Sequence, residues 1–309
     1  MAFHHNLTSA KYDPNPVAHS SVLDLDEEFN SLINPDNSKK IGYMVYLGFE
    51  SDYDKELIEA MEQLAAEGIT DLILDLRMNG GGSVNSSTML ASMILSESYV
   101  GQTYATLKRN PKNTLFPKDR LNTECLITKN GLGEFDSKDL PNLDLPELWD
   151  IASNYSASAS EMEIKGLEGL DVPVHIVGKT TNGKNCGMDV MEKTFGEYKY
   201  TYAPITFMNE NGKGFSDYGE GIVPEVNLAA LAENSSVSSK LQSRCNYFPI
   251  PLTTWDDVKN DIALEEAVMQ ICGSSLFASS ASAESSTRAS VEMLPQPMKQ
   301  HKLVQRDVK

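Results

Sequence analysis

Two short segments of the chain carry residues that could perform nucleophilic chemistry together. Residues 156–161 read Ser-Ala-Ser-Ala-Ser-Glu, and Gly183-Lys184 lies in a turn expected after a buried strand. A serine hydroxyl is a weak nucleophile until a base removes its proton, and a neutral lysine amine can be that base. The pairing predicts a hydrolase that forms a covalent acyl intermediate.

Within the serine-rich run, Ser158 has a position that could suit a nucleophile. It is expected at the start of a helix, where the positive end of the helix dipole stabilises developing negative charge and the N–H of Ala159 could bind an oxyanion. Serine is also a preferred N-cap, and Ser156 fits that role well. From this run alone, a cap and a nucleophile both remain open.

The candidate base is Lys184, and its one histidine rival is His175. A lysine acts as a base only when neutral, which requires an apolar pocket without a close carboxylate. The ordinary alternative is an exposed loop lysine. His175 lies inside an expected strand at 172–177, whereas the other four histidines fall in polar segments near the two ends of the chain. A structural role for His175 is the more common outcome.

Three consecutive glycines follow the expected strand at 72–76. Gly80, Gly81 and Gly82 can expose backbone N–H groups and adopt positive φ angles, which suits a nest for an anion or an oxyanion. The same glycines are equally compatible with a tight strand-to-helix turn that binds nothing. The small residues at 156–160, in turn, would let another segment of the chain approach closely.

One motif in the same region misleads. Residues 178–184 match the Gly-x4-Gly-Lys pattern of a phosphate-binding loop after a strand. Asn185 stands where a magnesium-binding Ser or Thr is required, and the following residues do not begin a helix that could cradle phosphate. A nucleotide site is therefore not expected here.

Hydrophobic periodicity predicts an α/β fold. Strands are expected at 41–47, 72–76, 148–152 and 172–177, further β-structure at 187–207, and helices at 54–67, 84–95, 256–272 and from about 158. Residues 1–39 are interpreted as a lead-in or the remnant of an upstream region, 40–273 as the catalytic core, 108–146 as an inserted cap or irregular segment, and 274–309 as a disordered tail.

Composition excludes several classes of function. The 309 residues carry a net charge of −18, which disfavours nucleic acid and anionic membrane surfaces as partners. No run is long and apolar enough to span a bilayer, and the first residues lack the basic and apolar regions of a signal peptide. Four widely spaced cysteines indicate neither a disulfide framework nor a zinc motif. No metal or cofactor is expected, and the oligomeric state is not predicted.

Four motifs in order resemble the C-terminal processing (tail-specific) serine peptidases. They are Asp-Leu-Arg-Met-Asn-Gly-Gly-Gly at 75–82, the serine run at 155–161, Gly178 to Lys184, and Gly-Ile-Val-Pro-Glu-Val at 221–226. The resemblance implies a crotonase-like ββα superhelix and a polypeptide substrate cut near its C-terminus or within unstructured segments. It also implies Ser158 as nucleophile, Lys184 as base, an oxyanion hole from Ala159 with Gly80 or Gly81, and a location outside the cytoplasm.

The chain departs from that family at three points. Residues 1–39 are too few for the PDZ domain that many members carry, Met188 replaces a glutamine that helps to orient the lysine, and Asp150 interrupts an apolar strand. Two other functions therefore stay open. One is a peptide-binding relative without catalysis, and the other is a crotonase-type acyl-CoA enzyme that uses the glycine turn as its oxyanion hole.

Overall fold

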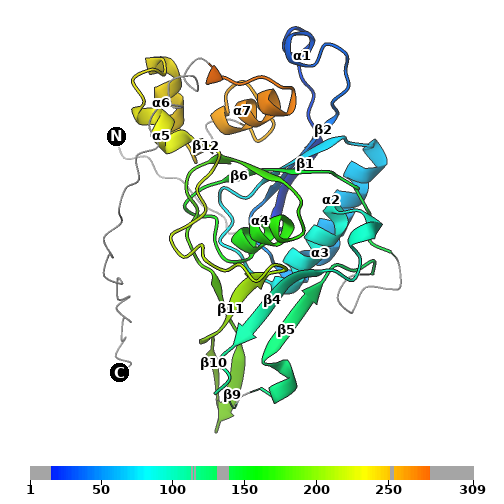
Figure 1. The fold of residues 1–309 in the computed structure, drawn as a ribbon, viewed down its shortest axis with the longest axis vertical. Coiled ribbons are helices and arrows are strands. Elements are labelled where there is room, and N and C mark those ends of the chain that lie inside the picture. Colours follow the sequence, from blue (N-terminus) through cyan, green and yellow to red (C-terminus); the bar gives the residue numbers. More distant parts are fainter. Residues whose placement is uncertain (1–14, 113, 115, 131–138, 251–253, 279–309) are drawn as a thin grey trace, which may run out of the picture.

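The apolar runs predicted as buried strands form one central sheet (Figure 1). This computed structural model describes residues 15–112, 114, 116–130, 139–250 and 254–278. The sheet has the order β1-β2-β3-β6-β7-β12, in which β1 is antiparallel to β2 and all other neighbours are parallel. Its strands are β1 (Val17–Val22), β2 (Ile41–Tyr46), β3 (Asp71–Asp75), β6 (Leu148–Ala152), β7 (Val174–Gly178) and β12 (Val226–Asn227).

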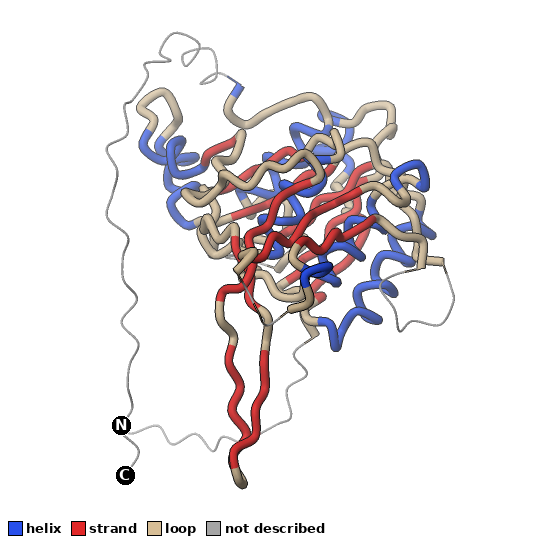
Figure 2. The backbone as a smooth tube through the Cα atoms, turned by 60° about the horizontal axis from the view of Figure 1, so that its bottom comes forward, coloured by secondary structure: helices blue, strands red, loops and turns tan. Residues whose placement is uncertain are grey.

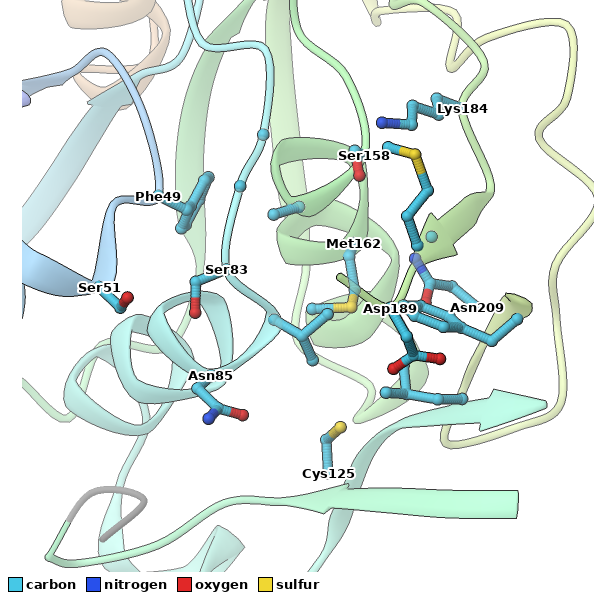
Figure 3. A pocket seen from close by; sticks show the side chains of 18 of the residues that line it. Phe49, Ser51, Ser83, Asn85, Cys125, Ser158, Met162, Lys184, Asp189 and Asn209 are labelled. Atoms are coloured by element: carbon cyan, nitrogen blue, oxygen red, sulfur yellow. The ribbon is translucent and has the colours of Figure 1, made fainter. Parts of the chain in front are cut away.

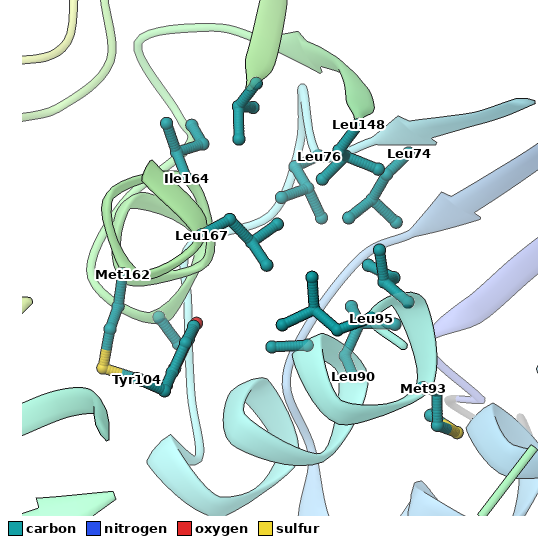
Figure 4. Close-up of a cluster of buried hydrophobic side chains, with 14 of the residues drawn as sticks. Leu74, Leu76, Leu90, Met93, Leu95, Tyr104, Leu148, Met162, Ile164 and Leu167 are labelled. Atoms are coloured by element: carbon teal, nitrogen blue, oxygen red, sulfur yellow. The ribbon is translucent and has the colours of Figure 1, made fainter. Parts of the chain in front are cut away.

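Helices cover both faces of this sheet, which explains why its inner strands are mostly apolar on both faces. Alternate side chains of each strand enter two separate cores: in β2, Met44 and Tyr46 join one core and Tyr43 and Val45 the other. The first core lies under α2 (Asp54–Glu67), α3 (Val84–Ile94) and α4 (Ala159–Gly169) (Figure 4). The second lies under α1 (Glu27–Ile33), α5 (Leu228–Glu233), α6 (Ser239–Tyr247) and α7 (Ile262–Ile271).

The helix ends follow local sequence signals. Gly68 takes φ +65° and closes α2, as its position predicts. The side chain of Ser83 caps α3 by accepting the N–H of Ser86, and Asp261 caps α7 by accepting the N–H groups of Ala263 and Leu264. No helix in the described part of the chain has the length and apolarity that crossing a bilayer requires.

A second, antiparallel sheet of order β5-β4-β11-β8 stands beside the first. Its strands are β4 (Thr103–Arg109), β5 (Asn122–Leu126), β8 (Cys186–Met188) and β11 (Ile205–Asn211), and a hairpin of β9 (Met191–Phe195) and β10 (Tyr198–Tyr202) projects between β8 and β11. The irregular segment expected at 108–146 thus contains β5, because a half-exposed edge strand needs only one buried residue, Cys125, and shows little periodicity. Residues 113, 115 and 131–138 of that segment lie outside the described residues.

Residues 15–39 are also more ordered than their polar sequence suggests. Val17–Val22 pairs with β2 as an edge strand, where one unpaired side tolerates His19, Ser20 and Ser21. The short helix α1 follows, capped by Asp26. Helices α5 and α6, at 228–247, were not predicted, since both are short and only Leu228 and Cys245 are buried in them. Residues 279–309 of the expected tail lie outside the described residues.

A buried ion network joins the end of β3 to α7. The guanidinium of Arg77 donates from Nε to both oxygens of Asp75 at 2.8 and 2.9 Å and from Nη1 to Asp261 at 2.6 Å. The hydroxyl of Tyr43 donates to Asp75 at 2.8 Å. Asp75 and Arg77 are two residues apart, whereas the second acid of Arg77, Asp261, lies far along the chain.

Two buried carboxyl groups, those of Asp150 and Glu163, lie on the side of the sheet that faces α4. Asp150 extends from the middle of β6 without a hydrogen-bond partner among the described residues. Burial, with the charges of Asp75 and Glu163 adding to it, raises the pKa of Asp150 well above its usual range. Glu163 on α4 accepts from Tyr104 at 3.0 Å and from Ser87 at 3.1 Å. Burial raises its pKa to about 8, although these two hydrogen bonds oppose the rise.

These two carboxyl groups should make the protein less stable as the pH rises. An acid whose pKa is higher in the folded than in the unfolded state stabilises the fold fully only below its unfolded pKa. For Glu163 this contribution is lost as the pH rises from 4.5 to about 8. Each such group removes up to about 1.4 kcal/mol of unfolding free energy per pH unit within its window.

The measurement is urea unfolding between pH 5 and 8 for the wild type and for Glu163→Gln and Asp150→Asn. Each variant should show a smaller loss of stability toward pH 8 than the wild type. Glu62→Gln, at an exposed position on α2, serves as the control and should keep the wild-type slope. If the unfolding free energies of all four proteins changed in parallel with pH, the raised pKa values of Glu163 and Asp150 would be contradicted.

Candidate active site

The candidate residues surround one cavity of about 960 Å³ between the two sheets (Figure 3). The glycine turn after β3 forms one wall, the first turn of α4 brings Ser158, and the loop from β7 to β8 brings Lys184. Leu107 of β4 and Phe207 of β11 line the side formed by the antiparallel sheet. The cavity therefore collects residues from segments that are far apart in the sequence, as the carboxyl edge of a parallel sheet allows.

Ser158 has an unusual backbone conformation. It occupies the N-cap position of α4 with φ +58° and ψ −110°, a region that residues with a side chain rarely adopt. Such strain costs about 1–3 kcal/mol and is found mainly at functional sites. The conformation turns the chain sharply into α4 and leaves the half-buried Ser158 side chain at the cavity, with the positive end of the helix behind it.

The glycine turn packs against the backbone on both sides of Ser158. A Cβ atom on Gly81 would lie 2.6 Å from the carbonyl oxygen of Ala157 and 2.7 Å from the Cβ of Ser158. Asn79 fixes this contact, because its backbone oxygen accepts the N–H of Ala157 at 3.2 Å and the hydroxyl of Ser160 at 3.0 Å. Only glycine fits at position 81, which agrees with the close approach predicted from the sequence.

The glycine amides differ in their availability. The N–H of Gly81 donates to Oδ1 of Asn79 at 2.9 Å, and Asn79 is itself held through a hydrogen bond from Nδ2 to the backbone oxygen of Tyr46. Within the described part of the chain, the N–H groups of Gly80 and Ala159 have no hydrogen-bond partner, although both residues line the cavity. Of the predicted oxyanion donors, Gly80 and Ala159 are thus free and Gly81 is already engaged.

Glu161 connects the segment that carries Ser158 to the segment that carries Lys184. Its fully buried carboxylate accepts the N–H of Ser158 at 3.0 Å and the N–H of Lys184 at 2.8 Å through Oε2. Through Oε1 it accepts the N–H of Gly183 and the hydroxyl of Thr181, both at 2.6 Å. Four donors match the acceptor capacity of one carboxylate, so a single side chain fixes both backbones.

Lys184 lies in the loop from β7 to β8 and lines the cavity. Its half-buried side chain extends toward Ser158 in Figure 3, and both residues line the same cavity. Glu161 binds the backbone N–H of Lys184, and none of the ion pairs in the described residues includes the Lys184 amine. Asp189, another acid at the cavity, is paired with Arg109 at 3.0 Å. The structure therefore brings Ser158 and Lys184 together.

His175 is not brought to this site. On β7 it alternates with Val174 and Ile176, which belong to the core under α4, so its ring lies on the opposite face of the sheet. There it stacks on Trp149 at 4.4 Å and contacts Glu225 at 2.9 Å. Its second ring nitrogen contacts Glu147 at 3.3 Å. The interpretation of His175 as an alternative base does not fit this geometry.

One further expectation needs revision. Ser156 is not the cap of α4, because its hydroxyl donates to the backbone oxygen of Leu76 at 2.7 Å and accepts the N–H of Ser153 in a preceding turn. Met188 is exposed at the cavity, and Glu161 holds the lysine segment through the N–H of Lys184. This role of Glu161 was not predicted from the sequence. Its position three residues after an N-cap serine is the signal that could have revealed more.

The backbone strain at Ser158 leads to a stability prediction. Ser158→Gly should be more stable than Ser158→Ala by about 1–2 kcal/mol, because glycine adopts positive φ without steric cost. Chemical denaturation of both variants at pH 7 measures the difference. The matched pair Ser160→Gly and Ser160→Ala, inside α4, should show the reverse order, since glycine destabilises a helix interior. Equal stabilities of the two Ser158 variants would contradict the strained conformation.

Comparison with known proteins agrees with this site. The profile of Peptidase family S41 matches residues 40–228. Two relatives from Staphylococcus aureus, strains bovine RF122 / ET3-1 and N315, are each named "Probable CtpA-like serine protease". They are 25% identical over 189 residues and 26% identical over 190 residues. Each match covers 61% of this chain and 33% of the relative.

A solved structure from Bacteroides fragilis NCTC 9343, a "Putative S41 protease", shares the fold. Its TM-score is 0.63 at 19% identity, over 85% of this chain and 59% of that one. The chain spans about a third of the length of the curated relatives it matches. The family match covers more than half of the chain and includes the glycine turn, Ser158, Glu161 and Lys184. The chain belongs to peptidase family S41.

Proposed function

We propose that the protein is a serine endopeptidase that hydrolyses peptide bonds with a Ser158–Lys184 dyad. The observation that carries this proposal is the Glu161 carboxylate, which fixes the backbones of both residues at one cavity. A nucleophile and a base on separate loops react efficiently only when their relative position is fixed. Family membership supports the same reaction class.

The first half of the proposed reaction forms an acyl-enzyme. Nζ of neutral Lys184 takes the proton of Ser158 Oγ while Oγ bonds to the carbonyl carbon of the scissile peptide. The resulting oxyanion receives hydrogen bonds from the free N–H groups of Gly80 and Ala159. When the C–N bond breaks, the ammonium of Lys184 returns the proton to the leaving amine.

The second half releases the product acid. Lys184, again neutral, takes a proton from a water molecule that attacks the acyl carbon. The ester bond to Ser158 Oγ then breaks, and Oγ recovers the proton from Lys184. No carboxylate in the described part of the chain forms an ion pair with the Lys184 amine.

The substrate we propose is an extended polypeptide, cut near its C-terminus or in an unstructured segment. The lining of the cavity combines apolar side chains such as Met162 and Phe207 with the backbone of the glycine turn. The name of the S. aureus relatives points to the same class of enzyme. The crotonase-like superhelix and a location outside the cytoplasm also remain proposals, and both depend on the family resemblance.

Removing either member of the dyad should abolish cleavage without unfolding the protein. For Ser158→Ala and Lys184→Ala, kcat/KM on an unstructured protein such as β-casein should fall at least about 10³-fold, because nucleophile and base act as one unit. The assay is product formation by gel and mass spectrometry, with circular dichroism as the control for folding. Full activity in Ser158→Ala would refute the assignment. A wild type that binds but never cleaves would favour the peptide-binding alternative.

Glu161 should be required for positioning the dyad. Glu161→Gln keeps the size of the side chain but replaces two acceptor positions by donors that face N–H groups. We expect kcat to fall about 10–100-fold with little change in KM, because misplacement of the reacting groups affects mainly the chemical step. A parallel readout is the rate at which a fluorophosphonate modifies Ser158, which should fall by a similar factor.

The control for this variant is Glu168→Gln on the same helix, where the side chain pairs with Lys165 away from the cavity. It should leave both rates unchanged. If Glu161→Gln lowered stability but kept wild-type kcat and labelling rate, the carboxylate would be purely structural.

A further inference from the structure

The hairpin of β9 and β10 extends away from the body of the protein directly from the rim of the active-site cavity (Figures 1 and 2). The chain passes from Lys184 through β8 into β9, and it returns from β10 into β11. Residues on both sides of its base line the cavity: Met188, Asp189 and Val190 before β9, and Ala203 after β10. The hairpin is therefore a continuation of the cavity wall.

The two faces of this hairpin differ in chemistry. Antiparallel pairing sets Phe195 opposite Tyr198, Lys193 opposite Tyr200 and Met191 opposite Tyr202, and opposed residues share a face. We call these six residues the aromatic face. Its members contact one another, since Phe195 meets Tyr200 edge to face at 5.7 Å and the Lys193 amine lies over the Phe195 ring. The other face carries only Glu192, Thr194, Lys199 and Thr201.

Nothing in the described part of the protein covers the aromatic face. Tyr198 is 71% exposed and Phe195 is 52% exposed, and β9 and β10 pair only with each other. A two-stranded hairpin is marginally stable by itself, and natural proteins usually shield free strand edges. Exposed aromatic side chains combined with free edges are features of a surface that receives an extended chain.

We propose that the aromatic face and the adjoining edges of this hairpin bind the unfolded polypeptide substrate outside the cavity. The proposal rests on the proposed peptidase function and adds a second contact region to it. The argument for this occupant is the continuity of the hairpin with the cavity wall. A chain that occupies the cavity and leaves it past Met188 or Ala203 meets the hairpin at once.

The chemistry of the hairpin suits a substrate that is defined by being unfolded. Tyrosine gives a large contact area with few rotatable bonds and tolerates many partner sequences. Residues 191–202 carry two lysines and two glutamates, so this region is neutral although the whole chain has a net charge of −18. The hairpin can therefore hold segments of either charge sign without the repulsion that the acidic body exerts on acidic substrates.

The test compares a long with a short substrate in the full chain. The triple variant Tyr198→Ser, Tyr200→Ser and Tyr202→Ser removes the three tyrosines of the aromatic face. The matched control, Glu192→Gln with Thr194→Ser and Thr201→Ser, changes the opposite face. The long substrate is reduced, carboxymethylated α-lactalbumin, and the short one is an eight-residue fluorogenic peptide that fills only the cavity.

We expect kcat/KM for the unfolded protein to fall about tenfold in the tyrosine variant, mainly through KM, because removing anchoring aromatic side chains weakens binding by at least this factor. Turnover of the short peptide should stay within about twofold, and the control variant should match the wild type. Equal losses on both substrates would overturn the proposal, since the hairpin would then merely support the cavity. No loss on either would overturn it as well.

Binding without turnover separates this proposal from the peptidase assignment. In a Ser158→Ala background, fluorescence anisotropy of the labelled unfolded protein should show a Kd about tenfold higher when the three tyrosines are removed. An unchanged Kd would refute the hairpin's role even if cleavage is established. If sedimentation shows a dimer that the tyrosine variant dissociates, the aromatic face belongs to a second copy of the chain, and the proposal is wrong.

Discussion

The site depends on one buried carboxylate that accepts four hydrogen bonds. Glu161 links the first turn of α4 to the loop after β7, and it binds backbone groups of Ser158 and Lys184. Three of its four donors are main-chain N–H groups, and the fourth is the hydroxyl of Thr181. A buried carboxylate with fewer partners would cost more stability.

The remainder of the fold holds this link in place. Parallel strands deliver the glycine turn, α4 and the lysine loop to the same edge of the sheet, and the antiparallel sheet closes the cavity from the side. Asn79 then connects the glycine turn to β2 and to the segment before Ser158. The strained backbone at Ser158 persists because these contacts on both sides over-determine it.

The inner strands and helices α2, α3 and α7 could be predicted, because buried parallel strands and amphipathic helices have strong periodic patterns. The predicted residues Ser158 and Lys184 line one cavity, and their role as a dyad stays a prediction. It missed elements with weak patterns: β1 is a polar edge strand, β5 has one buried residue, and α5 is six residues long. The roles of Glu161 and Asp261 could not be predicted, since each depends on a partner distant in sequence. His175 stayed open as an alternative base in the sequence, because strand parity alone does not say which face of the sheet carries the site.

The ion network around Arg77 bears on which segment of the chain could fold by itself. The match to the family profile ends at residue 228. Arg77, two residues before Asn79, nevertheless forms an ion pair with Asp261 at the start of α7. The apolar side chains of α7 also fill the core on the far face of the sheet. A buried guanidinium that loses one of its acids costs about 3–5 kcal/mol. We therefore expect a segment that folds by itself to include α7, and so to be longer than the segment that the family profile matches.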